Sequence, residues 1–306
     1  MDERLSPYLE VSPPARPLVR ADLLPWARRA IWGRWAEVVL NYLALATIAA
    51  YFLAPMVWLV TSAFRANPSV YVAFEGWTLA NFPRLLKEET FLWIRNSLII
   101  ALGTTAMTLL TAFPAAYPFA RLEFRGKATL LFALALSMTI PFSAVLLPTY
   151  SLARLLGLQN SLLGVALILA ARQIPMAIWV LKEFIRAIPI DLEEAAWVDG
   201  ASPGAVLLRI LLPLSGPGLA VVGLMAFVGG WGDFATSLIL LSREELFPIS
   251  MGIYKASIEA TSWGYVTVDY GVMAAISLLY MAFPALAFLL THRYLVAGMV
   301  IGAVRE

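Results

Sequence analysis

Six long apolar segments constrain what this chain can fold into more than any other feature. They lie at about residues 38–62, 96–118, 128–149, 160–181, 217–241 and 270–291. A hydrocarbon core about 30 Å thick needs roughly 20 apolar residues per helix, and each segment reaches that length. Inside lipid, a helix satisfies every backbone N–H and C=O group within its own segment. Alternating strands typical of a transmembrane barrel are absent. We therefore predict an all-α membrane protein with six transmembrane helices.

The composition agrees with this class and excludes several others. The chain is 61% apolar and 14% charged, whereas soluble proteins carry about 25% charged residues. A net charge of +2 gives no reason to expect nucleic acid as a partner. The chain has no cysteine and a single histidine, His292, so thiol nucleophiles and Cys-based or His-based metal sites are disfavoured. We predict no catalytic residue and no metal ligand.

The first 35 residues are predicted to be a cytoplasmic tail, followed by a membrane domain over residues 36–306. Residues 5–17 are rich in proline, and residues 23–35 interleave tryptophan with arginine. The second pattern suits a short helix at the cytoplasmic headgroups, with a charged tail that only sets topology as the alternative. No small-x-small cleavage pattern follows the first apolar run, so we interpret that run as an uncleaved span.

The distribution of cations sets the predicted orientation. The tail, the loops after spans two and four and the C-terminal end together hold twice as many Lys and Arg residues as the other side. The positive-inside rule therefore places both termini in the cytoplasm, together with the long loop between spans four and five.

That loop, about residues 182–216, has the local signals of two short helices. Asp191 is positioned to cap a helix over 192–199, and Gly200 suits the left-handed residue that ends one. Ser202 and Pro203 restart a helix as its cap and first residue, and Pro213 and Pro217 are expected to stop it before span five. Connections between elements have a median length near 4–6 residues, so a loop this long favours a docking role over a plain connector.

The loop also resembles a known family. Glu194-Ala195-Ala196, three residues, Gly200, nine residues and Ile210-x-Leu212-Pro213 is similar to the loop of ABC importer membrane subunits. Further matching segments are Asn96–Leu98, Ala120–Leu122 with Gly126-Lys127, Leu156–Ser161, Ile188–Glu194 and Arg293–Val304. These segments resemble the carbohydrate-uptake branch, and within it the six-span membrane subunit of maltose transporters.

The resemblance implies a permease subunit of a bacterial or archaeal cytoplasmic-membrane importer. Its expected partners are a paralogous permease, two cytoplasmic ATPase subunits that hold ATP and Mg, an extracytoplasmic solute-binding protein and a sugar or related polyol. No cofactor is expected on this chain, which also lacks the Gly-x4-Gly-Lys-Ser/Thr phosphate loop. The residues expected to couple to the ATPase are Glu193, Glu194, Ala195, Ala196, Asp199, Gly200, Ile210, Leu212 and Pro213.

Polar residues inside predicted spans are candidates for the transport pathway, because charge at a helix centre usually faces protein or water. Arg172 and Gln173 lie in span four, and Trp231 and Asp233 lie in span five. The family is commonly less polar at Arg172-Gln173, and its usual Trp-Asn-Glu/Asp-Phe stands here as Trp231-Gly232-Asp233-Phe234. Arg172 and Asp233 have two open interpretations: an ion pair between the spans, which we favour, or a pathway lining shared with Gln173 and Trp231.

Two other functions compete with the importer subunit. A self-contained secondary transporter or channel needs a coupling-ion site near mid-membrane, for which only Asp233 is suitable. A membrane-bound enzyme needs a nucleophile or metal site, and the acidic residues of the loop have neither in sequence reach.

Overall fold

The computed structural model describes residues 24–69, 71–85, 88–260 and 266–303. The chain divides into two units, residues 1–56 and 57–306, and each is described by itself. The first unit contains most of helix α1, Leu24–Ala63. The predicted headgroup helix is not a separate element, since α1 continues without a break into the predicted first span. The proline-rich stretch 5–17 lies outside the described residues.

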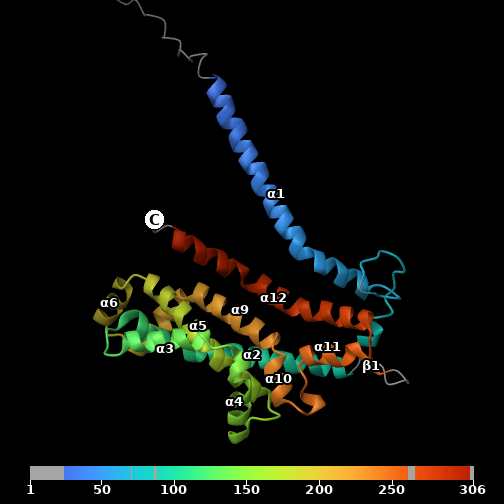
Figure 1. Ribbon diagram of the computed structural model, residues 1–306. Helices are drawn as coiled ribbons and strands as arrows, with labels where there is room; N and C mark the ends of the chain where they lie inside the picture. Colours follow the sequence, from blue (N-terminus) through green and yellow to red (C-terminus); the bar gives the residue numbers. More distant parts are fainter. Residues whose placement is uncertain (1–23, 70, 86–87, 261–265, 304–306) are drawn as a thin grey trace, which may run out of the picture. The chain divides into compact units, whose positions relative to one another are not determined.

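The second unit is almost entirely helical (Figure 1). Its elements are η2 Pro83–Leu85, α2 Glu88–Arg121, α3 Lys127–Thr139, α4 Phe142–Leu155, α5 Leu162–Ala187, α6 Asp191–Val198, α7 Pro203–Val206, the π-helical η3 Leu207–Leu211, α8 Leu212–Leu214, α9 Gly216–Trp231, α10 Ala235–Leu240, η4 Glu244–Leu246, α11 Ile249–Ser257, β1 Ile258–Ala260, β2 Val266–Val268 and α12 Tyr270–Ala303. The strands β1 and β2 form an antiparallel pair with Glu259 opposite Thr267. This pair is a small addition to the predicted all-α fold.

Four of the described helices are long and apolar enough to cross a membrane: α1, α2, α5 and α12. Two bent helix pairs raise the number to six if each pair counts as one span. The predicted segment 128–149 corresponds to one of these pairs, α3 with α4. The other pair joins the loop stretch Pro203–Leu214 to α9, and of this pair only α9 lies in the predicted segment 217–241.

The predicted span 128–149 is broken, which corrects the expectation of one continuous helix. Helix α3 ends at Thr139, and α4 leaves it at an angle of 101°. Ile140 has φ −74° and ψ 118°, an extended conformation. The cause is Pro141, because a proline ring disfavours helical geometry in the residue before it.

The predicted span 217–241 is also interrupted. Helix α9 ends at Trp231, and α10 begins at Ala235. Between them the carboxylate of Asp233 accepts hydrogen bonds from the backbone N–H of Thr236 at 3.3 Å and of Ser237 at 2.8 Å. A carboxylate in this position caps the new helix, so the sequence starts α10 instead of continuing α9.

Helices α2, α5 and α9 pack together as the centre of the second unit. A Cβ atom added at Gly230 of α9 would lie 2.8 Å from the Cα atom of Ala101 in α2. Such close backbone approach requires a small residue, as is common between membrane helices. Further along the bundle, Leu181 and Ile185 of α5 are buried in a core cluster with Ala112 of α2 and Val222 of α9. The coupling loop and the α11–β1 region lie at opposite ends of this bundle (Figure 1).

The end of the bundle opposite the loop is held together by one buried amide and one buried hydroxyl. Asn96, fully buried in α2, donates hydrogen bonds to the carbonyls of Glu245 at 2.8 Å and Phe247 at 3.0 Å. Next to it, the Ser97 hydroxyl accepts a bond from the N–H of Ile249 at 2.8 Å. These contacts satisfy backbone groups that no helix or strand pairs. They give a structural role to the predicted Asn96–Leu98 motif.

Candidate coupling site

The site is built around α6, an eight-residue helix at one end of the bundle (Figure 1). Gly200 follows the helix with φ +81° and donates its N–H to the carbonyl of Trp197 at 3.0 Å. The N–H of Ala201 bonds the carbonyl of Ala196 at 2.9 Å. Together these bonds form a Schellman motif, in which a left-handed glycine ends the helix. The predicted role of Gly200 as the helix terminator is confirmed.

The predicted start of this helix was wrong. Asp191 is the first helical residue instead of the cap, and no side chain caps α6. Ile190 has helical dihedral angles, and its carbonyl accepts the N–H of Glu194 at 3.1 Å. The helix therefore begins one residue earlier than its capping pattern predicts, so Asp191 places its carboxylate in the first turn, where the helix dipole favours negative charge.

The second half of the loop begins as predicted. The Ser202 hydroxyl accepts the N–H of Ala205 at 3.3 Å, and Pro203 is the first helical residue. Pro213, however, does not stop the helix. The chain stays helical to Leu214 through a π turn in which the N–H of Leu212 bonds the carbonyl of Leu207. A π turn shifts the hydrogen-bond ladder by one residue, which accommodates a proline that cannot donate.

The direction change comes at Ser215 instead. Here α9 turns away from the preceding helical stretch Pro203–Leu214 by 77°. Ser215 is buried, and its hydroxyl has no hydrogen-bond partner in the structure.

Glu193, one of the residues expected to couple to the ATPase, is buried. Its side chain is 0% exposed, and its carboxylate lies 2.6 Å from Nε of Arg121 at the end of α2. The Tyr117 hydroxyl donates to the same carboxylate at 3.3 Å, and Arg121 also donates to the carbonyl of Ile188 at 2.7 Å. A buried ion pair with these added hydrogen bonds is costly to break by removing one partner. Glu193 therefore fastens α6 to α2.

The neighbouring residues form the exposed face of α6. Glu194, Ala195, Asp199 and Gly200 are all exposed. Two large apolar residues join them: Trp197 is 43% exposed and Val198 is 88% exposed. Sequence reasoning missed both, although tryptophan is among the residues enriched at protein interfaces. We call this set, residues 194, 195 and 197–200, the α6 outer face.

Most of the remaining loop residues expected to couple to the ATPase are partly buried. Ala196, Ile210 and Leu212 are half-buried and pack against the core that contains Leu181 and Ile185, whereas Pro213 is exposed. The family-like positions of the loop therefore divide between an outer face and an inner set that holds the loop on the bundle.

The two charges predicted inside the membrane do not pair with each other. Arg172 is exposed on α5, and its guanidinium lies 3.7 Å from the ring centre of Phe142 in α4. Asp233 caps α10 and also accepts the Ser237 hydroxyl at 3.0 Å. The ion pair we favoured from the sequence is therefore not formed among the described residues. Each charge has a closer local partner.

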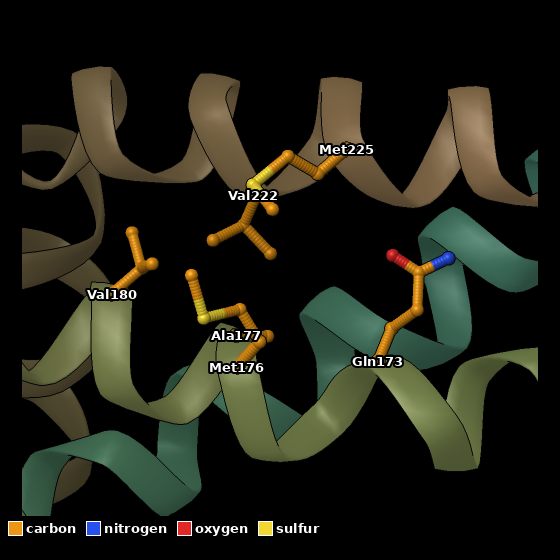
Figure 2. A pocket seen from close by; sticks show the side chains of 6 residues that line it. All are labelled: Gln173, Met176, Ala177, Val180, Val222 and Met225. Carbon is orange, nitrogen blue, oxygen red and sulfur yellow. The ribbon is translucent and has the colours of Figure 1, made fainter. Parts of the chain in front are cut away.

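Gln173 and Trp231 connect helices. The Gln173 amide donates to the carbonyl of Ala226 in α9 at 3.3 Å, and Trp231 donates to the carbonyl of Tyr280 in α12 at 3.0 Å. Gln173 also lines a cavity of about 20 Å³ between α5 and α9, with methionines from both helices (Figure 2). That volume holds about one water molecule. A sugar does not fit this cavity in the conformation described.

No group of three or more metal-binding side chains occurs among the described residues.

The chain matches one family model and is similar to several transport permeases. Residues 108–299 match the family model described as binding-protein-dependent transport system inner membrane component. The chain is 30% identical to the galactooligosaccharides transport system permease protein GanQ of Bacillus subtilis, over 89% of this chain and 97% of that protein. It is also 30% identical to the trehalose/maltose transport system permease protein MalG of Thermococcus litoralis, over 83% and 91%.

A solved structure supports the fold. The chain resembles a subunit in the crystal structure of a bacterial ABC transporter that imports the acidic polysaccharide alginate, with a TM-score of 0.73. The match covers 86% of this chain and 98% of that one at 19% identity, and it therefore speaks for the architecture alone.

Proposed function

Because this chain belongs to the family of binding-protein-dependent transport system inner membrane components, we propose that it forms half of the membrane pathway of an ATP-driven sugar importer. The family membership is what makes it a membrane permease subunit. The sugar, the partner subunits and the residues that contact them are proposals, supported below.

The α6 outer face is the observation that carries the proposed coupling. It combines exposed apolar side chains, Trp197 and Val198, with exposed carboxylates at Glu194 and Asp199. Apolar residues at the centre with charges beside them are typical of a protein–protein interface. The chain has no phosphate loop of its own, so an ATPase subunit is the partner that the proposed transport cycle requires.

The attachment of α6 suits force transmission. Glu193 and Arg121 lock the inner side of the helix to the end of α2, and Ala196 packs on the core below. A helix held at two places moves with the bundle when its outer face is pushed. We propose that ATPase closure reaches the spans by this route, with α2 as the first helix to respond.

A sugar substrate is supported by the relatives. GanQ and the MalG protein of Thermococcus litoralis carry names that assign them to galactooligosaccharide and trehalose/maltose transport. Both align over more than four-fifths of this chain. We propose a disaccharide, an oligosaccharide or a related polyol as the substrate class.

The test of docking uses Val198→Arg, which places a charge in the middle of the outer face without disturbing any buried contact. The wild-type or variant chain is purified in mild detergent from its native membrane, together with the subunits that remain bound to it. We expect the variant to insert into the membrane and to retain the partner permease, but to lose the ATPase. Arg154→Gln, at the exposed end of α4, serves as the control at a distance from the loop.

Retention of the ATPase by the Val198→Arg variant at the wild-type ratio would show that the outer face is not the docking surface. Loss of both partners together would instead indicate misfolding, which the thermal stability of the isolated chain then detects.

A further inference from the structure

A second surface of this chain, on the seam between α3 and α5, has the features of a lipid site. Two cavities open on this seam. One, of about 530 Å³, is lined by the end of α2, the 122–126 loop and the facing ends of α3 and α5. The other, of about 650 Å³, is lined by later residues of α3 and earlier residues of α5. The family membership assigns no role to either.

The first cavity is basic. Lys127, Lys182 and Arg186 line it together with one carboxylate, Glu123. Lys127 lies 2.8 Å from the carboxylate of Glu123, whose side chain is 89% exposed, and also donates to the carbonyl of Leu122 at 2.9 Å. An ion pair with so exposed a carboxylate is weak. Lys182 is 8% exposed and pairs with Glu183 at 2.8 Å. Arg186 has no carboxylate partner in the part of the chain that the structure describes.

The wall of this basic cavity also includes the first turn of α3. No side chain caps that helix, because its N-cap residue is Gly126. Uncapped N–H groups at a helix start favour an anion, which adds to the attraction of the three cations. The chemistry that these groups recognise together is a phosphate.

The second cavity is largely apolar, with Thr139 and Glu183 also in its lining. Ala135 and Met138 of α3 face Met176, Val180 and Phe184 of α5 across it. The side chain of Lys182 links the two cavities, since its ammonium lies 4.3 Å from the ring centre of Trp179, which lines the apolar one. Along α3, the basic cavity begins at Gly126 and the apolar cavity reaches Thr139.

The length of the seam can be compared with the thickness of one membrane leaflet. Helix α3 has 13 residues, which at 1.5 Å per residue gives about 20 Å. One leaflet of hydrocarbon is about 15 Å thick, half of a 30 Å core. On α5 the apolar cavity spans residues 176–184, about 13 Å at the same rise per residue, which is close to one leaflet. With the basic cavity at its end, it matches a phospholipid in both chemistry and size. A free phosphate uses only the first cavity.

We propose that the α3–α5 seam binds one anionic phospholipid, with its phosphate between Lys127 and Arg186 and one acyl chain beside Trp179. Basic pockets between membrane helices bind anionic headgroups by this chemistry. The site is separate from the α6 outer face, so the proposal stands whether or not that face docks an ATPase.

The experiment uses the purified chain in vesicles, with whichever subunits co-purify with it. The probes are phosphatidylglycerol and phosphatidylcholine, each with a photoreactive diazirine on the acyl chain. Labelled peptides are then mapped by mass spectrometry. We expect phosphatidylglycerol to label residues 135–139 and 176–184 in preference to phosphatidylcholine.

The double variant Lys127→Gln/Arg186→Gln removes two of the three cationic side chains that line the basic cavity. Each cation near an anionic headgroup changes affinity about fivefold, so the preference falls by roughly 30-fold. The control Arg154→Gln removes one exposed arginine elsewhere and keeps the preference. Unchanged elution of both variant complexes shows that they are folded.

Three results would overturn the proposal. Equal labelling by both lipids would make the seam an ordinary lipid-facing surface. If neither lipid labels the seam and the seam cross-links to the partner permease instead, protein covers the groove. Radiolabelled inorganic phosphate retained in phosphatidylcholine vesicles, and lost in the double variant, would assign the cavity to free phosphate.

Discussion

Glu193 and Glu194 are adjacent in the first turn of α6, but Glu193 is buried and Glu194 is exposed, so they offer a matched test of how the helix is attached. Replacing either by alanine removes one carboxylate from the same helix start and the same favourable interaction with the helix dipole. Only Glu193→Ala also orphans Arg121, whose side chain is 9% exposed. Removing one partner of a buried ion pair costs about 3–5 kcal/mol.

We therefore expect Glu193→Ala to lower the free energy of unfolding by about 3–5 kcal/mol. Glu194→Ala, at an exposed position, is expected to change the free energy of unfolding by no more than about 0.5 kcal/mol. The assay is unfolding of the purified chain in mixed micelles, with limited proteolysis of the loop as a local probe. Transport by the reconstituted complex is expected to fall in both variants, in Glu194→Ala without loss of stability.

Arg121→Met completes a double-mutant cycle. It removes the orphaned charge, so the double variant is expected to lose less stability than the sum of the two single variants, with a coupling of about 0.5–3 kcal/mol. Equal effects of the two glutamate variants on stability, or strictly additive losses in the cycle, would refute the buried attachment of α6 to α2.

Three further predictions follow from the same structure. Gly200→Ala places a side chain at φ +81° and is expected to destabilise the loop by about 1–2 kcal/mol. Gly204→Ala is the control, because Gly204 also has open space around it but lies in the helix α7, and this change is not expected to destabilise the loop. Resistance of the loop to protease measures both effects. Asn96→Leu leaves two carbonyls unpaired and is expected to cost about 1–3 kcal/mol or more, seen as faster hydrogen exchange in residues 245–249. The effects of Arg172→Ala and Asp233→Ala on the free energy of unfolding are expected to add, because the two charges do not contact each other. Asp233→Ala alone is expected to cost about 0.5–2 kcal/mol through the lost helix cap. A double variant more stable than the sum of the single losses would show that the two charges do form an ion pair.

What the sequence predicted well was local. Gly200, Ser202 and Pro203 act through hydrogen bonds and dihedral angles within a few residues of themselves, so their roles follow from residue type and spacing. The apolar segments were predictable for a similar reason, since membrane thickness sets their length without reference to any partner.

What the sequence did not predict depends on contacts between distant segments. Arg121 and Glu193 are separated by 72 positions, and only the folded chain brings them together. Local chemistry was also misread in two places. Pro141 breaks a span that hydropathy alone treats as continuous, and Asp233 starts a new helix where an ion pair with Arg172 was favoured.

The central claim is that this chain moves sugar only as part of an ATP-driven assembly. The most direct test reconstitutes it in vesicles with its partner permease, ATPase and solute-binding protein and measures the uptake of labelled oligosaccharides alongside ATP hydrolysis. The account predicts uptake that requires both ATP and the binding protein, and hydrolysis that the loaded binding protein stimulates. Uptake by this chain alone, without ATP, would contradict the account and establish a self-contained transporter.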